Sequence, residues 1–220
     1  FNLGAEPEAV RQRYGTGMRG RCYLLGRKLI ESGVRFVMVD VREPQRSFRD
    51  GKPVGYDGGN NMNWDHHDAI YAKTHTNIKG GGAGRGRWGI HTWPMMGSTD
   101  QALSALIEDM DQRGLLEETL VWWGGEFGRT PFSQSGDGRD HNPRGFTTWF
   151  AGGGVKPGIS YGATDELGDT AVENKVHMHD LHATLLHILG LDHEKLTYRH
   201  AGRDLRLTDV FGHVAKEILA

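Results

Sequence analysis

Residues 119–141, TLVWWGGEFGRTPFSQSGDGRDH, decide the fold that we expect for this chain. The stretch opens with the apolar run 120–123, whose β-branched and aromatic residues are typical of a strand buried on both faces. Two glycines end the run, and the acid Glu126 follows at the carboxyl end of the predicted strand. Ligands of open α/β sheets bind at that edge. We therefore expect half of an active site in the loop 126–141.

Helices and strands alternate on both sides of this stretch. The predicted helices span 6–13, 17–32, 98–113, 180–189 and 209–219. Ser98 or Thr99 is expected to cap the third of them, and Asp180 the fourth. Further strands are predicted over 34–41 and 146–151. The alternation favours an α/β protein, a three-layer αβα sandwich with a mostly parallel sheet. Three strands are few for such a sheet, so we expect its N-terminal part to lie outside this chain.

The composition of the 220 residues limits the possible partners. Net charge is −2 and the pI is near 6.7, so nothing attracts the chain to nucleic acid. Its apolar runs are far shorter than the roughly 20 residues of a transmembrane helix, so we expect no membrane span. The single cysteine, Cys22, excludes an internal disulfide and is interpreted as a small buried hydrophobe. Because the chain starts at Phe1 without Met, we expect a processed or truncated product.

A long Gly-rich stretch, at about 42–93, shows no sustained hydrophobic period. We interpret it as a loop insertion in one domain that covers 1–220, and long loops inside compact domains are usually functional or mobile. Residues 79–87 resemble a phosphate-binding loop in composition but lack the Lys-Ser/Thr ending of a P-loop, which favours a linker. The Trp and Gly content of 56–93 leaves a polysaccharide-binding or structural role open.

Three loops carry groups that bind divalent metals. These groups are the run Asp65-His66-His67-Asp68, then Glu126, then Asp140-His141. Zinc takes carboxylate oxygens and imidazole nitrogens, and loops that leave one edge of a sheet lie near each other. The pattern therefore predicts a metal site, although each group alone is more typical of a surface pair or a helix cap. In a second histidine tract, 177–187, His179 and His182 have a three-residue spacing that also suits metal ligands, but we favour helix caps and exposed helix positions for this tract.

Several motifs of the chain resemble those of a known family. They include Trp64-Asp65-His66-His67, Gly125-Glu-Phe-Gly-Arg-Thr-Pro131, Gly138-Arg-Asp-His141 and Asp180-Leu-His-Ala-Thr-Leu-Leu-His187. Together they resemble the C-terminal half of the domain-of-unknown-function family 1501, which is sulfatase-like and belongs to the alkaline phosphatase superfamily. The resemblance covers nearly the whole chain. It is interrupted at 40–63, which is longer than the usual connection into the Trp-Asp-x-His motif.

The resemblance implies an alkaline phosphatase-like fold and a two-metal hydrolase site. By the order of the superfamily's motifs, the implied metal ligands are Asp65, His67, Glu126 and His141. Zinc is the first choice for the metal, with calcium, magnesium or manganese as alternatives. The nucleophile is not in this chain, because the resemblance places it upstream of Phe1, in another half of the same protein.

Two arginines complete the implied site. Arg129 or Arg139 could bind the anionic group of a substrate through two hydrogen bonds. The implied substrates are phosphate or sulfate esters of small molecules or polysaccharides. The resemblance also suggests an exported or periplasmic protein, since such proteins often carry an export signal.

Two functions are open at this point. One is a metal-dependent hydrolase of phosphate or sulfate esters, and the other is a non-catalytic metal- or anion-binding domain of the same fold. An upstream apolar strand that ends in Asp, followed by a Ser, Thr or Cys, would favour the enzyme.

Overall fold

A computed structural model of the protein describes residues 2–40, 47–49, 52–54, 64, 66–67, 70–71, 89–133 and 138–220. The chain divides into two compact units. Unit 1 comprises Phe1–Leu115 and Arg129–His141, and unit 2 comprises Leu116–Gly128 and Asn142–Ala220. That residues 1–220 form one domain stays a prediction. Most of the predicted loop insertion at 42–93, with its segment 79–87, lies outside the described residues. None of the helices in the described ranges is long and apolar enough to cross a membrane.

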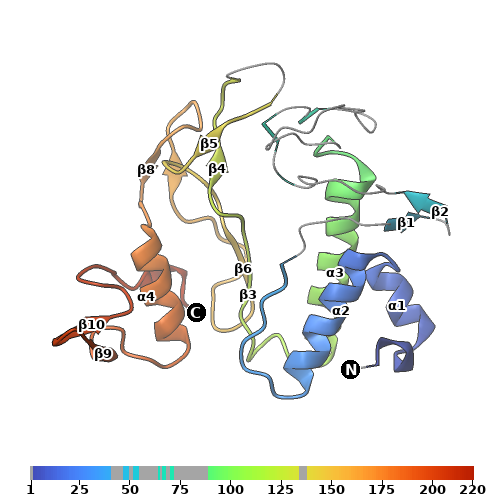
Figure 1. The fold of residues 1–220 in the computed structure, drawn as a ribbon, viewed down its shortest axis with the longest axis horizontal. Coiled ribbons are helices and arrows are strands. Elements are labelled where there is room, and N and C mark those ends of the chain that lie inside the picture. The colour runs from blue at the N-terminus through green and yellow to red at the C-terminus, as the bar shows by residue number, and fades with distance from the viewer. Residues whose placement is uncertain are drawn as a thin grey trace. The chain divides into compact units, whose positions relative to one another are not determined.

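Three helices form the core of unit 1. They are α1 (Glu8–Tyr14), α2 (Met18–Glu31) and α3 (Ser98–Gln112), and each contacts the other two (Figure 1). A short 3-10 helix, η1 (Leu3–Ala5), precedes α1, and a π-helical turn, η2 (Trp93–Gly97), leads into α3. Tyr14, Leu24 and Ala105 are buried at the centre of the three helices. The helices predicted near 6–13, 17–32 and 98–113 are confirmed.

Charged side chains also join these helices. The fully buried guanidinium of Arg27 in α2 lies 2.7 Å from Glu6, 2.6 Å from Glu31 and 2.9 Å from Asp109 of α3. The Tyr14 hydroxyl donates a hydrogen bond of 2.9 Å to the same Asp109 carboxylate. One cation therefore connects α2 with α3 and with the segment that precedes α1.

The start of α3 differs from the predicted cap. The helix follows Gly97, whose lack of a side chain rules out a side-chain cap, and both Ser98 and Thr99 lie inside the helix. Their hydroxyls donate to Met95 O and accept hydrogen bonds of 2.7 Å from Nη1 of Arg19. Arg19 is buried in α2, and its guanidinium also lies 5.6 Å from the ring of Trp64. Arg19 thus connects α2 to α3 and to the Trp-Asp-x-His motif.

The strands overturn the predicted sandwich with its mostly parallel sheet. In unit 2, β3 (Val121–Trp123) pairs antiparallel with β6 (Trp149–Ala151), Trp122 opposite Phe150. The strands of the described residues form two-stranded sheets only. Of these, β1 (Ser47–Arg49) with β2 (Lys52–Val54), β7 (Ala163–Thr164) with β8 (Ala171–Glu173) and β9 (Thr197–His200) with β10 (Arg203–Arg206) are also antiparallel. The prediction of an αβα sandwich is wrong.

The strand predicted at 34–41 is also wrong over its described part, 34–40, which forms no strand. The apolar side chains of this segment point alternately to two sides, and Val37 and Val39 lie on the side next to α2. A Cβ atom on Gly26 would lie 3.1 Å from Val39 and 3.8 Å from Val37. On the other side, Phe36 and Met38 are each 80% exposed. A central strand needs other elements on both of its faces. In this segment the face that carries Phe36 and Met38 is exposed.

Unit 2 contains one longer helix, α4 (Met178–Ile188), which confirms the helix predicted near 180–189. His177, rather than Asp180, is its N-cap residue. The His177 side chain accepts a hydrogen bond from the amide of His179, and Asp180 accepts one from the amide of His177. This reciprocal capping box gives part of the histidine tract a structural role.

The helix predicted over 209–219 is wrong. Asp209 and Gly212 have φ angles of 54° and 100°, which a right-handed helix does not accommodate. Only the 3-10 turn η3 (Lys216–Ile218) forms in this region.

Candidate metal centre

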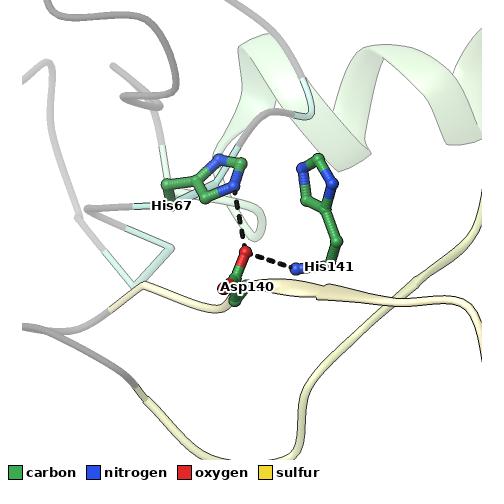
Figure 2. Close-up of side chains that lie close together, drawn as sticks. All are labelled: His67, Asp140 and His141. Carbon is green, nitrogen blue, oxygen red and sulfur yellow. Dashed lines mark hydrogen bonds and ion pairs between the residues drawn. The ribbon is translucent and has the colours of Figure 1, made fainter.

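Three potential metal ligands lie together in unit 1 (Figure 2). His67, Asp140 and His141 each offer a ligand atom, and these atoms lie within 4.8 Å of one another. Nε2 of His67 is 3.4 Å from Oδ1 of Asp140, and the centroids of the two imidazole rings are 4.7 Å apart. His67 and Asp140 are half-buried, and His141 is exposed. The cluster is thus accessible from solvent on one side.

Thr130 fixes the main chain beside Asp140. Its amide donates a 2.9 Å hydrogen bond to Asp140 O, and its hydroxyl oxygen accepts one of 3.2 Å from the Asp140 amide. The same hydroxyl donates to Phe132 O at 2.7 Å, and Thr130 is buried. These bonds lie beside the two-stranded sheet of β4 (Gly128–Arg129) and β5 (His141–Asn142). The two ends of the loop between these strands are therefore held together next to the cluster.

The Asp140 side chain turns back along its own backbone. Oδ1 accepts a 2.7 Å hydrogen bond from the amide of His141 (Figure 2). This bond holds the pKa of Asp140 below its usual value; burial opposes the shift, and the neighbouring imidazoles add to it. Asp140 directly precedes β5, and neighbouring residues of an extended chain normally point to opposite sides. The bent-back carboxylate instead stays beside the two rings, in the ionised form that a metal ligand requires.

The loop that carries His67 is bonded to the strand that carries His141. The amide of Arg139 donates a 2.8 Å hydrogen bond to His66 O. His66, which directly precedes His67, is buried, with 2% of its surface exposed. Further along, the amide of Ile90 donates a 2.8 Å bond to Ile70 O.

The guanidinium of Arg129 lies between the same two segments. Nη2 donates to Trp64 O at 3.2 Å, and Nη1 donates to Arg139 O at 3.3 Å. Nη1 is also 3.4 Å from Nδ1 of His67. Arg129 therefore reaches the main chain of both ligand-bearing segments.

The side chain of Arg139 points to Tyr71. Its Nη2 donates to the Tyr71 hydroxyl at 3.2 Å, and its guanidinium carbon lies 5.4 Å from the centre of the Tyr71 ring. Nη1 donates to Gly138 O at 2.8 Å. Two of the nitrogens of Arg139 thus have protein partners, while the side chain remains partly exposed.

The family model described as "Protein of unknown function (DUF1501)" matches residues 1–219. The chain belongs to the DUF1501 family. This confirms the family that the motifs indicate, whereas the relation to sulfatases stays a prediction. No curated protein and no solved structure matches the chain.

The structure of this DUF1501 protein brings two of the four predicted ligands together, His67 and His141. Asp65 lies outside the described residues. Glu126 belongs to unit 2, where it is exposed in the bend between β3 and β4, and its place in the site stays a prediction. Asp140 was not among the ligands that the resemblance implies. The sequence signal for Asp140 was its position directly before His141, a candidate ligand.

The donor set fits a divalent metal of the zinc type. Two imidazoles and one carboxylate are the protein ligands of one class of catalytic zinc site, which keeps a fourth position open. Zinc holds nitrogen and oxygen ligands at about 2.0–2.2 Å, so tetrahedral ligands lie about 3.4 Å apart. The ligand atoms of His67, Asp140 and His141 lie within 4.8 Å of one another. The separation in the structure exceeds the tetrahedral one by about 1.4 Å at most, so small side-chain movements would let all three bind a single ion.

Proposed function

We propose that this DUF1501 protein binds a divalent metal ion, zinc first, through His67, Asp140 and His141, and that the site serves hydrolysis of phosphate or sulfate esters. The observation that carries the metal site is the cluster itself, because its donors come from two segments far apart in the sequence and lie within 4.8 Å. The ester chemistry is supported by the resemblance of the motifs to those of sulfatase-like enzymes.

The residue types suit this chemistry. A bound divalent ion would stabilise the negative charge that develops on the oxygens of a phosphate or sulfate ester. His67 and His141 would each supply one ring nitrogen, and Asp140 would supply an ionised oxygen. Arg139, which is partly exposed beside the cluster, is the cation that we assign to the anionic group of the ester.

Zinc titration of the full-length protein tests the metal site. We expect a stoichiometric complex by calorimetry or by competition with a chelating dye. His141→Ala should weaken zinc binding at least tenfold, because one of three protein ligands is lost. The matched control is His187→Ala, which removes an exposed histidine of α4 and should leave the affinity unchanged. Equal zinc affinity of His141→Ala and the wild type would show that the metal lies elsewhere.

Turnover is measured with p-nitrophenyl phosphate and p-nitrophenyl sulfate on the zinc-loaded and the metal-free full-length protein, which includes the half that the resemblance places upstream of Phe1. The hydrolase proposal expects activity with one of the two esters, lost on chelation and restored by zinc. Zinc binding without turnover of either ester would favour the alternative, a non-catalytic metal- or anion-binding domain.

A further inference from the structure

The two main-chain acceptors of Arg129 set this arginine apart from Arg139. One acceptor is Trp64 O, three residues before His67, and the other is Arg139 O, directly before Asp140. A guanidinium has five N–H donors in a rigid planar arrangement and can span two carbonyls at once. Arg129 therefore bridges the two segments that carry the proposed ligands.

We propose that Arg129 is a positioning residue, which holds the His67 loop against the Asp140–His141 strand, in place of the contact to a substrate anion that the sequence suggests. This inference rests on the proposed metal site. The ring of His67 lies between the two segments, with Nδ1 3.4 Å from Arg129 Nη1 and Nε2 3.4 Å from Asp140 Oδ1. The two carbonyl bonds, at 3.2 and 3.3 Å, are shorter than either ring contact, and they are the contacts that join the two segments.

The amide of Arg139, bonded to His66 O, forms a second connection between the same segments. Loss of the Arg129 side chain would leave this main-chain bond in place. We therefore expect the His67 ring to lose its orientation while the fold is kept. Residues that orient metal ligands typically change metal affinity by about 10–100-fold when they are replaced.

Arg129→Lys distinguishes positioning from anion binding. Lysine keeps the positive charge but cannot donate to two carbonyls in one plane. The positioning role predicts that zinc affinity falls about tenfold, while phosphate binds the zinc-loaded variant as it binds the zinc-loaded wild type. The matched control, Arg139→Lys, should keep zinc affinity and weaken phosphate. Unchanged zinc affinity in Arg129→Lys would overturn the inference.

A measurement on the metal-free protein separates this inference from the metal proposal. Diethylpyrocarbonate modifies accessible imidazoles, and mass spectrometry of the peptides gives the rate at His67. We expect Arg129→Lys to raise this rate several-fold and Arg139→Lys to leave it near the wild-type rate. An unchanged rate in Arg129→Lys would refute the positioning role whether or not the wild type binds zinc. A raised rate in a protein that binds no zinc would refute the metal site alone.

Discussion

Replacement of Arg27 by methionine should destabilise unit 1 more than any exposed substitution on the same helix. The Arg27 side chain is completely buried, and methionine fills part of its volume without its charge. Glu6 and Asp109, whose side chains are 9% and 8% exposed, would then each lose one of their cationic partners. Burial alone would lower the pKa of Arg27, but the hydrogen bond that it donates to Glu6 and the charge of Asp109 outweigh burial and raise that pKa. The native structure thus favours the charged form of Arg27.

The expected loss of unfolding free energy depends on which cations remain beside Glu6 and Asp109 after the substitution. Removal of one partner from a buried ion pair costs about 3–5 kcal/mol. Glu6 keeps Lys28, and Asp109 keeps Arg113 at 2.8 Å, so we place the loss at the lower end, about 3 kcal/mol. For a protein of this size, each kcal/mol lowers the melting temperature by about 2–4 °C, which gives a decrease of about 6–12 °C.

Urea denaturation, monitored by circular dichroism, measures this loss of unfolding free energy. The matched control is Arg21→Met, an exposed position of α2, which should stay within about 0.5 kcal/mol of the wild type. Arg27→Lys keeps the charge but not the three separate contacts. Its unfolding free energy should lie between those of Arg27→Met and Arg21→Met. If Arg27→Met unfolds at the same urea concentration as Arg21→Met, the network contributes no net stability and the reasoning is refuted.

Two further predictions concern acid stability and the strand before the site. The pKa of Glu6 is lowered to about 2, chiefly by the hydrogen bond from Arg27 and then by that from Lys28. Because the folded-state pKa is depressed, this contribution to stability is complete above about pH 4.5 and is lost as the pH falls toward 2. Unfolding free energy should therefore decrease across this window, and less so in Glu6→Gln; an equal decrease in both would contradict the assignment. A Cβ atom on Gly128 would lie 2.6 Å from Gly145 O, whereas one on Gly125 would meet no atom closer than 3.8 Å. Gly128→Ala should lower both the melting temperature and the zinc affinity, and Gly125→Ala neither; an unaffected Gly128→Ala would show that β4 adjusts freely.

Helices α2, α3 and α4 were predictable from the sequence because their pattern is local. The apolar positions of α2, α3 and α4 recur at the helical period, and glycines follow or nearly follow their ends. The precise starts were less predictable. Ser98 and Thr99 have the chemistry of cap residues, but their hydroxyls serve Arg19, which lies far away in the sequence.

The arrangement of strands was not predictable, because it depends on partners distant along the chain. The run 120–123 has the composition of a strand, and β3 is one, but its antiparallel pairing with β6 has no local signature. In the same way, nothing in 34–40 shows which of its faces is covered. Apolar composition predicts that a segment prefers burial and does not identify its partner.

The candidate site was predictable in part, because metal ligation restricts the residue types. The residue chemistry pointed to the groups that include His67 and His141, and the resemblance to the family singled out these two histidines. Asp140 belonged to the same residue pattern but not to the ligand set that the resemblance implies, and the hydrogen bond that turns its carboxylate toward the two rings exists only in the folded chain. The bridge made by Arg129 was hidden as well, since its two acceptors are main-chain carbonyls, which every residue has.

The hydrogen bond between the Ile90 amide and Ile70 O brings two residues that are twenty positions apart next to each other. The stretch of chain between these two residues leaves and returns at one place, so its length does not set the spacing of His67 and His141. Each doubling of a flexible loop costs only about 0.6 kcal/mol. We therefore expect that a peptide inserted between residues 71 and 89 leaves the zinc affinity unchanged.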